Sequence, residues 1–226
     1  MFYEKALAFA QIQCQSLTTK ALQTFQNQLT EAYRQKLSTS ALKSAQAMAI
    51  YAAARMPATY HAVQSCYQHL PADFHPQSLL DLGAGPGTAS LAALDYWPSL
   101  RRLTLVENHR LMYDFQRALW EHLNPGPSYQ PIHDSVDSLQ KLLDEGFDIV
   151  VLAYVLGELK AGQQQDAILK AWQKTMKYFL IVTPGTPHDF EYLLRVRDEL
   201  LGKGAVIVAP CPHQDRCPLT ETWRLH

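Results

Sequence analysis

The pattern of hydrophobic positions changes near Pro76. Before this residue, apolar side chains recur at helical spacing, which predicts helices over most of residues 1–70. One helix would run to Leu37 after a cap at Thr18 or Thr19, and another would run from Ser40 to Met56. Pro57 should end that helix, and a further helix should follow it to about residue 70.

After Pro76, short apolar runs alternate with segments of helical period. The runs, which we interpret as strands, cover residues 79–82, 103–106, 129–132, 147–154, 178–182 and 205–209. The helical segments cover residues 86–97, 109–122, 162–176 and 189–202. Such alternation predicts an α/β fold with a mostly parallel sheet covered on both faces. The last residues, 221–226, could add a strand that returns antiparallel beside 205–209.

These patterns divide the chain into three parts. We predict an N-terminal helical extension over residues 1–70, a linker over residues 71–78 that contains two prolines, and an α/β domain over residues 79–226. No apolar run approaches the roughly 20 residues that a membrane helix requires, so we expect no membrane partner. Only four cysteines occur and no secretory signal is visible, which predicts a cytoplasmic protein with reduced thiols.

Charge is distributed unevenly although the net charge is −1. Residues 1–60 carry six Lys or Arg and two Glu, so the excess of negative charge lies in the rest of the chain. A solvated helical face explains the excess of positive charge in residues 1–60, and contact of this part with an anion such as RNA is the alternative.

The segment DLGAGPG, from Asp81 to Gly87, carries the strongest chemical signal. An apolar strand leads into it and a helix follows, so the turn places free backbone N–H groups beside a ligand. A second acid, Glu107, ends the next strand, where it can accept hydrogen bonds from ribose hydroxyls. Turn and acid together predict a nucleoside-cofactor site, although a tight structural turn and a solvated charge remain open. We assign cofactor contacts to Asp81, Gly83, Ala84, Gly85, Pro86, Gly87 and Glu107.

The D-x-G-x-G-x-G spacing resembles motif I of class I S-adenosylmethionine (SAM) methyltransferases. The resemblance implies a Rossmann-like fold with a seven-strand-type sheet and SAM as cofactor. It also implies that the leading acid meets the methionine amino group. A nicotinamide-dependent oxidoreductase is the alternative, but its fingerprint is G-x-G-x-x-G.

Further candidates follow the later strands. In this class of enzyme an acid after the third strand meets the adenine amine, which makes Asp134 a candidate, although it could equally cap a helix. Tyr154 and Glu158 follow the fourth strand and should face the site, so they are our catalytic candidates, and Tyr154 is also a candidate for cofactor contact. The alternative is that Tyr154 packs against a helix and Glu158 caps one. Tyr60 lies on a helix upstream of the turn and could close over the cofactor, with a core position as the alternative. Arg55 could meet the methionine carboxylate or an RNA phosphate.

The expected machinery of base methylation is incomplete. No D/N-P-P-Y/F motif follows the fourth strand, and no cysteine lies in the segment directly after the fourth or the fifth strand to serve as a nucleophile. Methyl transfer mainly requires alignment of the acceptor and exclusion of water. The absence of the motif and of the cysteine therefore leaves methylation of other acceptors open.

Five segments in order, ARMPATYHAV (54–63), DLGAGPGTAS (81–90), VLGEL (155–159), TPGTP (183–187) and APCPH with CPL and Trp223 (209–223), make the resemblance specific. They are similar to the methyltransferase-like family associated with the mitochondrial small ribosomal subunit, which also has bacterial members. The resemblance implies SAM-dependent methylation of small-subunit ribosomal RNA, or a role in small-subunit assembly. A non-catalytic assembly factor and a small-molecule methyltransferase with a helical lid are the alternatives.

Members of that family can hold an iron–sulfur cluster on four cysteines, two of which match Cys211 and Cys217. This sequence has Trp223-Arg224 where the family has a further cysteine after the tryptophan, and it ends at His226. Two cysteines cannot hold such a cluster, so we expect no resident metal. The alternative is zinc on Cys211, His213, Cys217 and His226.

Overall fold

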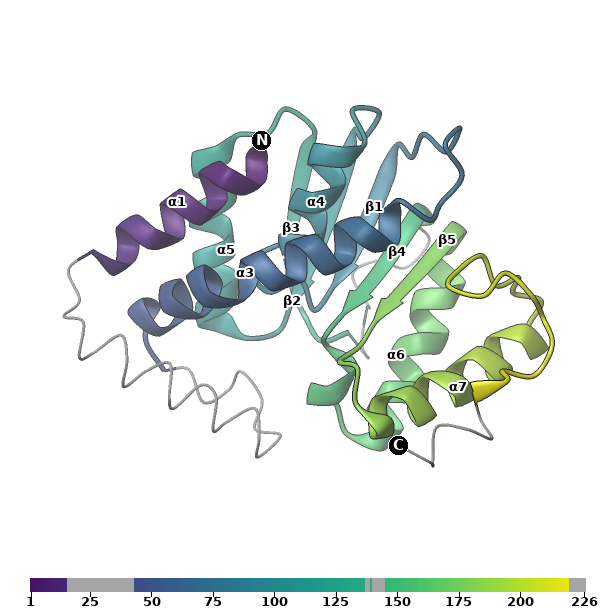
Figure 1. Ribbon diagram of the computed structural model, residues 1–226. Helices are drawn as coiled ribbons and strands as arrows, with labels where there is room; N and C mark the ends of the chain where they lie inside the picture. The colour runs from purple at the N-terminus through teal and green to yellow at the C-terminus, as the bar shows by residue number, and fades with distance from the viewer. Residues whose placement is uncertain (16–42, 137–138, 140–144, 220–226) are drawn as a thin grey trace.

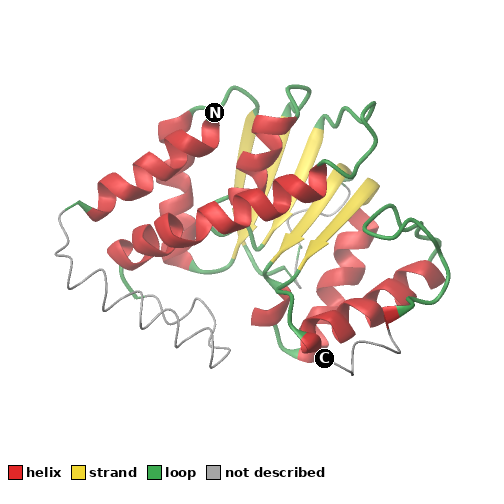
Figure 2. Ribbon diagram, viewed as in Figure 1, coloured by secondary structure: helices red, strands yellow, loops and turns green. Residues whose placement is uncertain are grey.

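The computed structural model describes residues 1–15, 43–136, 139 and 145–219. Helices and strands alternate along most of this length (Figures 1 and 2). The helices are α1 (Phe2–Cys14), α3 (Ala45–Tyr67), α4 (Thr88–Tyr96), α5 (Arg110–Leu123), α6 (Ala161–Lys174) and α7 (Pro187–Gly202), with a 3₁₀ turn at Leu156–Glu158. The strands are β1 (Ser78–Leu82), β2 (Arg102–Glu107), β3 (Ser128–His133), β4 (Phe147–Ala153) and β5 (Thr175–Val182).

All five described strands are parallel and lie in the order β3-β2-β1-β4-β5. This confirms the predicted α/β class with a parallel sheet. The chain places β2 and β3 on one side of β1 and then crosses over to place β4 and β5 on the other side. The strand order therefore reverses direction at β1. Leu82 at the end of β1 is level with Val106 on β2 and with Leu152 on β4. The carboxyl ends of these three strands therefore meet at the switch point where α/β sheets bind ligands.

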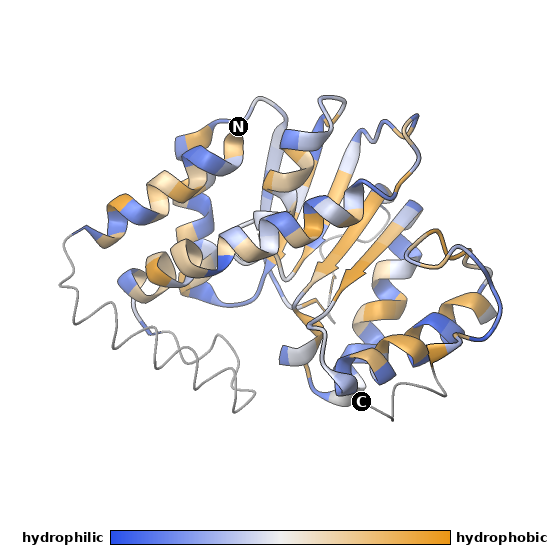
Figure 3. Ribbon diagram, viewed as in Figure 1, coloured by the Kyte–Doolittle hydropathy of each residue, from blue (hydrophilic) through white to orange (hydrophobic). Residues whose placement is uncertain are grey.

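Two hydrophobic cores lie on opposite faces of the sheet. On one face α1, α3, α4 and α5 pack over side chains such as Leu79, Leu103 and Ile149. On the other face α6 and α7 pack over side chains such as Leu80 and Val150. The central strands are apolar along most of their length in Figure 3, as expected for strands buried on both faces. The helices of the predicted extension thus share a core with the sheet. No described helix is both long and apolar enough to span a bilayer.

Helix α3 runs through Pro57, so the prediction that this proline ends the helix is wrong. A proline inside a helix removes one backbone hydrogen bond, at a cost of about 3 kcal/mol. Buried residues from Ala47 to Tyr67 lie on both sides of Pro57, and their packing outweighs this cost. The hydroxyl of Ser44 caps the helix by accepting from the Ala47 N–H at 3.1 Å. The predicted cap at Ser40 and the predicted helix before it lie outside the described residues.

The predicted strand at 205–209 is absent, so the described part of the sheet has five strands and not the seven implied by the resemblance. The side chain of Val206 is 71% exposed, and Pro210 and Pro212 lack the N–H groups that a ladder needs. The predicted final strand at 221–226 lies outside the described residues. Helix α7 begins at Pro187, two residues before the predicted segment 189–202, and the Thr186 hydroxyl caps it by accepting from the Asp189 N–H.

Candidate cofactor site

The turn after β1 depends on glycine at two positions for different reasons. Gly83 and Gly85 have φ angles of +69° and +56°, which L side chains rarely adopt. A Cβ atom at Gly83 would lie 2.3 Å from the Val155 Cγ2 atom, so this glycine allows the loop after β4 to pack closely. A Cβ atom at Gly85 would meet nothing within 4 Å. The backbone at Gly85 is therefore open toward a ligand.

The carboxylate of Glu107 fastens this turn to the end of β2. Its Oε2 atom accepts from the Gly85 N–H at 2.9 Å, and its Oε1 atom accepts from the His109 N–H at 2.7 Å. The side chain is only 6% exposed. Burial raises the pKa of Glu107, and the backbone hydrogen bonds partly oppose that rise. The two oxygens offer about four lone-pair sites in all, so the carboxylate can still accept from a ligand hydroxyl.

Asp81 lies beneath the turn and is 1% exposed. Its Oδ2 atom accepts from the Ser90 hydroxyl at 2.7 Å and from the Ser90 N–H at 3.2 Å. Burial raises the pKa of Asp81 to about 6, although the two Ser90 hydrogen bonds act in the opposite direction. A cationic ligand group near this carboxylate would favour its ionised form.

Helix α5 supports the turn from behind, through residues that the sequence analysis missed. Gln116 donates to the Gly85 carbonyl at 2.7 Å and accepts from the Tyr129 hydroxyl at 3.1 Å. The indole N–H of Trp120 donates to the Pro86 carbonyl at 3.2 Å. Both side chains are almost fully buried. The available signal was a glutamine among the apolar positions of one helical face, because a buried polar side chain requires partners.

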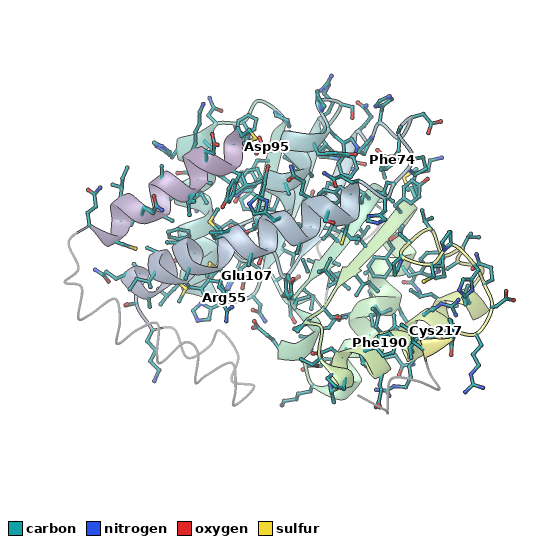
Figure 4. All side chains as sticks on the ribbon, in the orientation of Figure 1. Arg55, Phe74, Asp95, Glu107, Phe190 and Cys217 are labelled. Atoms are coloured by element: carbon teal, nitrogen blue, oxygen red, sulfur yellow. The ribbon has the colours of Figure 1, made fainter. Side chains whose placement is uncertain are left out.

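A pocket opens where these elements meet, at the carboxyl ends of β1, β2 and β4. Helix α3 forms one wall of it, while the glycine turn and the first turn of α4 form another. Figure 4 shows Arg55 on α3 near Glu107 at the end of β2. The lining residues from α3 are Tyr51, Arg55, Met56 and Thr59.

Most of the predicted site residues line this pocket. They are Asp81, Gly83, Ala84, Gly85, Pro86, Glu107, Tyr154 and Glu158. Gly87 precedes α4 as its cap, and a Cβ atom there would lie 2.5 Å from the Trp120 indole nitrogen. Asp134 is not among the lining residues, and its Oδ1 atom accepts from the Ser135 N–H at 2.8 Å. Val136 lines the pocket instead.

Tyr60 does not line the pocket, which corrects its predicted place over the cofactor. Its side chain is 2% exposed, stacks on the Tyr3 ring at 3.9 Å between centroids, and donates to Asp95 at 3.0 Å. Successive helical residues are rotated by about 100°, so the residues one position and five positions earlier face the pocket instead. These residues are Thr59 and Arg55.

Tyr154 directly follows β4 and has a φ angle of +61°, an uncommon conformation for a residue with a side chain. Its N–H donates to the Val182 carbonyl on β5 at 2.9 Å, which helps to hold this geometry. The ring lines the pocket and is 37% exposed. Burial is the main cause of the raised pKa of Tyr154. Backbone strain of this kind is concentrated at functional sites.

The C-terminal cysteines form no metal site in the described residues, which contain no group of three His, Cys, Asp or Glu placed to hold an ion. Cys211 is exposed, and Arg197 organises the loop by donating to the carbonyls of His213 and Asp215 at 3.0 and 2.7 Å. The described residues therefore do not fit a four-thiolate cluster. His226, the fourth ligand of the zinc alternative, lies outside them.

Comparison with known proteins identifies one family. Residues 45–224 match the family described as mitochondrial small ribosomal subunit Rsm22. The human mitochondrial ribosome assembly protein METTL17 is 30% identical over 184 residues, which are 75% of this chain and 40% of that protein. The Rsm22-cox11 tandem protein 2 of Schizosaccharomyces pombe is 27% identical over 160 residues, which are 63% of this chain and 21% of that protein. The chain thus spans less than half the length of these relatives.

Solved structures share the fold at lower identity. An O-methyltransferase family protein from Burkholderia thailandensis has a TM-score of 0.54 and 18% identity, and the match covers 67% of this chain and 48% of that one. PigF with S-adenosylhomocysteine (SAH) has a TM-score of 0.50 and 16% identity, covering 61% and 40%. These matches confirm a Rossmann-like methyltransferase fold.

The comparisons also correct one prediction. The matched family and the named relatives are mitochondrial proteins, so the prediction of a cytoplasmic protein is wrong. That prediction was based on cysteine content and on the first residues of the sequence, neither of which distinguishes one reducing compartment from another.

Proposed function

Because the chain belongs to the Rsm22 family of the mitochondrial small ribosomal subunit, we propose that it binds SAM and methylates small-subunit ribosomal RNA during subunit assembly. One observation supports this most directly. Two buried carboxylates, Asp81 and Glu107, flank an open glycine turn at the switch point of a parallel sheet. This arrangement suits a ligand that carries both a ribose and a cationic amine.

The pocket offers a partner for each polar group of SAM. Glu107 can accept from the ribose hydroxyls, and Asp81 can pair with the methionine ammonium. Arg55 can pair with the methionine carboxylate. The open backbone at Gly85 leaves room for the nucleoside. When bound, SAM supplies a methyl group on a sulfonium, which is activated without a metal.

Tyr154 and Glu158 are the proposed acceptor-side residues, since they line the pocket from the loop after β4. The raised pKa of Tyr154 keeps its hydroxyl protonated at neutral pH, so this residue would position the acceptor and not remove a proton from it. Glu158 is the acid on this loop that could accept a proton from the acceptor.

A non-catalytic assembly factor is the second candidate, and two observations favour it. METTL17 is named a ribosome assembly protein, and the loop after β4 lacks the D/N-P-P-Y/F motif. Such a protein would bind the small subunit whether or not its cofactor pocket is intact.

Two measurements test the proposal. Calorimetry with SAH and NAD in parallel should show binding of SAH alone, with the loss of SAH binding in Glu107→Ala. Transfer of a labelled methyl group to small-subunit particles should then occur with the wild type and not with this variant. SAH binding without transfer, together with cosedimentation that Glu107→Ala leaves unchanged, would support the assembly factor. Transfer to small molecules without cosedimentation would indicate a small-molecule methyltransferase.

A further inference from the structure

The carboxylate of Asp95 joins three helices at a point outside the pocket. Asp95 lies near the end of α4, and its Oδ1 atom accepts from the Phe2 N–H at 2.7 Å. Its Oδ2 atom accepts from the Tyr3 N–H at 3.1 Å and from the Tyr60 hydroxyl at 3.0 Å. Figure 4 shows Asp95 beside the start of α1. The first two bonds satisfy free N–H groups at the start of α1, and the third fixes α3.

A second tyrosine also connects α3 to α4, nearer the C-terminal end of α3. Tyr67 is fully buried, and its hydroxyl donates to the Ala89 carbonyl on α4 at 3.1 Å. Tyr60 and Tyr67 are seven residues apart, about two helical turns, so they project from the same side of α3. Ala89 itself lines the pocket. The two hydroxyls therefore set how α3 lies on the helix that follows the glycine turn.

The pocket-lining part of α3 lies directly before Tyr60. Arg55, Met56 and Thr59 fall within about one and a half turns of it on the same continuous helix. We propose that Asp95 and Tyr60 are positioning residues that hold this wall at the correct distance from the glycine turn. This inference depends on the proposed binding of SAM.

The arrangement also couples α1 to the pocket. The Tyr3 ring stacks on the Tyr60 ring with an interplanar angle of 19°, and both residues share the Asp95 carboxylate. When α1 packs against α3 and α4, its Tyr3 ring therefore adds to the contacts that hold Tyr60 in place. Since coupling between two binding events is reciprocal, a ligand in the pocket should in turn strengthen the docking of α1.

The test compares SAH affinity by calorimetry in Tyr60→Phe, Asp95→Ala and the double variant, at a temperature where circular dichroism shows each protein folded. Tyr60→Phe removes one hydroxyl and keeps the ring stack, and we expect SAH to bind about fivefold more weakly. Asp95→Ala should weaken binding at least as much. The double variant should match Asp95→Ala, because both changes break the same hydrogen bond.

Asp148→Ala is the matched control. Asp148 is also half-buried and accepts from two backbone N–H groups, those of Gln77 at 2.7 Å and Ser78 at 3.0 Å, but it lies at the opposite end of β1. The Asp148→Ala substitution should lower the melting temperature and leave SAH affinity unchanged. Wild-type affinity in both Tyr60→Phe and Asp95→Ala, or an equal loss in Asp148→Ala, would overturn the inference and leave the proposed function intact. A wild type that binds no SAH would overturn both. If Asp95→Ala does not fold, Tyr60→Phe decides.

Discussion

The Glu107 carboxylate and the Gly85 N–H lie 2.9 Å apart, so the acid proposed to hold the ribose also holds the glycine turn. The N–H groups of Gly83 and Ala84 add to this attachment by donating to the Val106 carbonyl at 2.9 and 3.0 Å. The turn after β1 and the end of β2 thus form one unit. Cofactor affinity and local stability should depend on the same side chain.

Glu107→Gln tests this double role. The amide keeps one acceptor oxygen but loses the other, and a hydrogen bond to a charged group contributes on the order of 1.5–3 kcal/mol. We expect SAH to bind at least about tenfold more weakly by calorimetry, with a lower melting temperature.

Glu121→Gln serves as its control. Glu121 pairs with Arg117 on the exposed side of α5, where such pairs contribute about 0–1 kcal/mol. Its affinity and melting temperature should equal those of the wild type. Equal affinity in Glu107→Gln and Glu121→Gln would remove Glu107 from the site.

Asp81 should make both stability and cofactor affinity depend on pH. Its pKa rises from 3.8 to about 6 on folding, so the folded protein binds this proton more tightly than the unfolded chain. The resulting stabilisation is complete below pH 4 and is lost as the pH rises through about 6. SAH affinity should change in the opposite direction, since a cationic amine requires the ionised carboxylate. Affinity of the wild type should therefore fall between pH 7 and pH 5.

Asp81→Asn separates these two effects. The amide oxygen can still accept from Ser90, and no buried charge forms at high pH. We expect the free energy of unfolding above pH 7 to rise by up to about 3 kcal/mol, which is the difference between the pKa values of Asp81 in the folded and unfolded states converted to free energy. SAH affinity should fall and lose its dependence on pH near 6. Urea unfolding and calorimetry across this range check both, and a variant less stable than the wild type at pH 8 would contradict the argument.

Gly83→Ala should mainly lower stability, whereas Gly85→Ala should mainly lower SAH affinity. Both strain a left-handed backbone, which costs about 1–2 kcal/mol. At Gly83 the new methyl group also collides with Val155, so the total loss should be roughly 2–5 kcal/mol. At Gly85 the methyl group enters the open pocket, so Gly85→Ala should retain most of its stability and lose SAH affinity. If Gly85→Ala bound SAH as tightly as the wild type, the nucleoside could not lie against this backbone.

The parts of the site that follow from local chemistry were predictable from the sequence. A glycine turn after an apolar strand, with an acid at the end of the next strand, can be recognised from the residue types and from their spacing along the chain. Asp81, Gly85 and Glu107 were predicted in this way, and all three line the pocket. The parallel direction of the strands was also predictable, because alternation of strand and helix favours parallel strands joined by crossover helices.

The wall formed by α3 was only partly predictable, because the spacing of residues does not set the rotation of a helix about its axis. Sequence offered both Tyr60 and Arg55. Packing against Tyr3 turns the Tyr60 ring away, whereas Arg55 lines the pocket together with Thr59, which sequence did not indicate. Pro57 also concealed the continuity of the helix. Gln116 was missed because its partner is a backbone carbonyl distant in sequence.

Tyr154 allows binding and transfer to be tested separately. Its φ angle of +61° costs an L residue about 1–2 kcal/mol, and glycine adopts it freely. In Tyr154→Gly this relief should offset much of the packing lost with the half-buried ring, so the melting temperature should change little. Methyl transfer to small-subunit particles should be lost, with a smaller effect on SAH affinity.

Tyr154→Phe shows which part of the side chain matters. Burial raises the pKa of the hydroxyl, so it stays protonated at neutral pH and cannot act as a base. The ring alone should then suffice to position the acceptor, and Tyr154→Phe should keep most of the transfer activity. Loss of transfer in the phenylalanine variant at unchanged SAH affinity would instead assign the hydroxyl a direct hydrogen bond to the acceptor. Full activity in Tyr154→Gly would remove this residue from the acceptor side altogether.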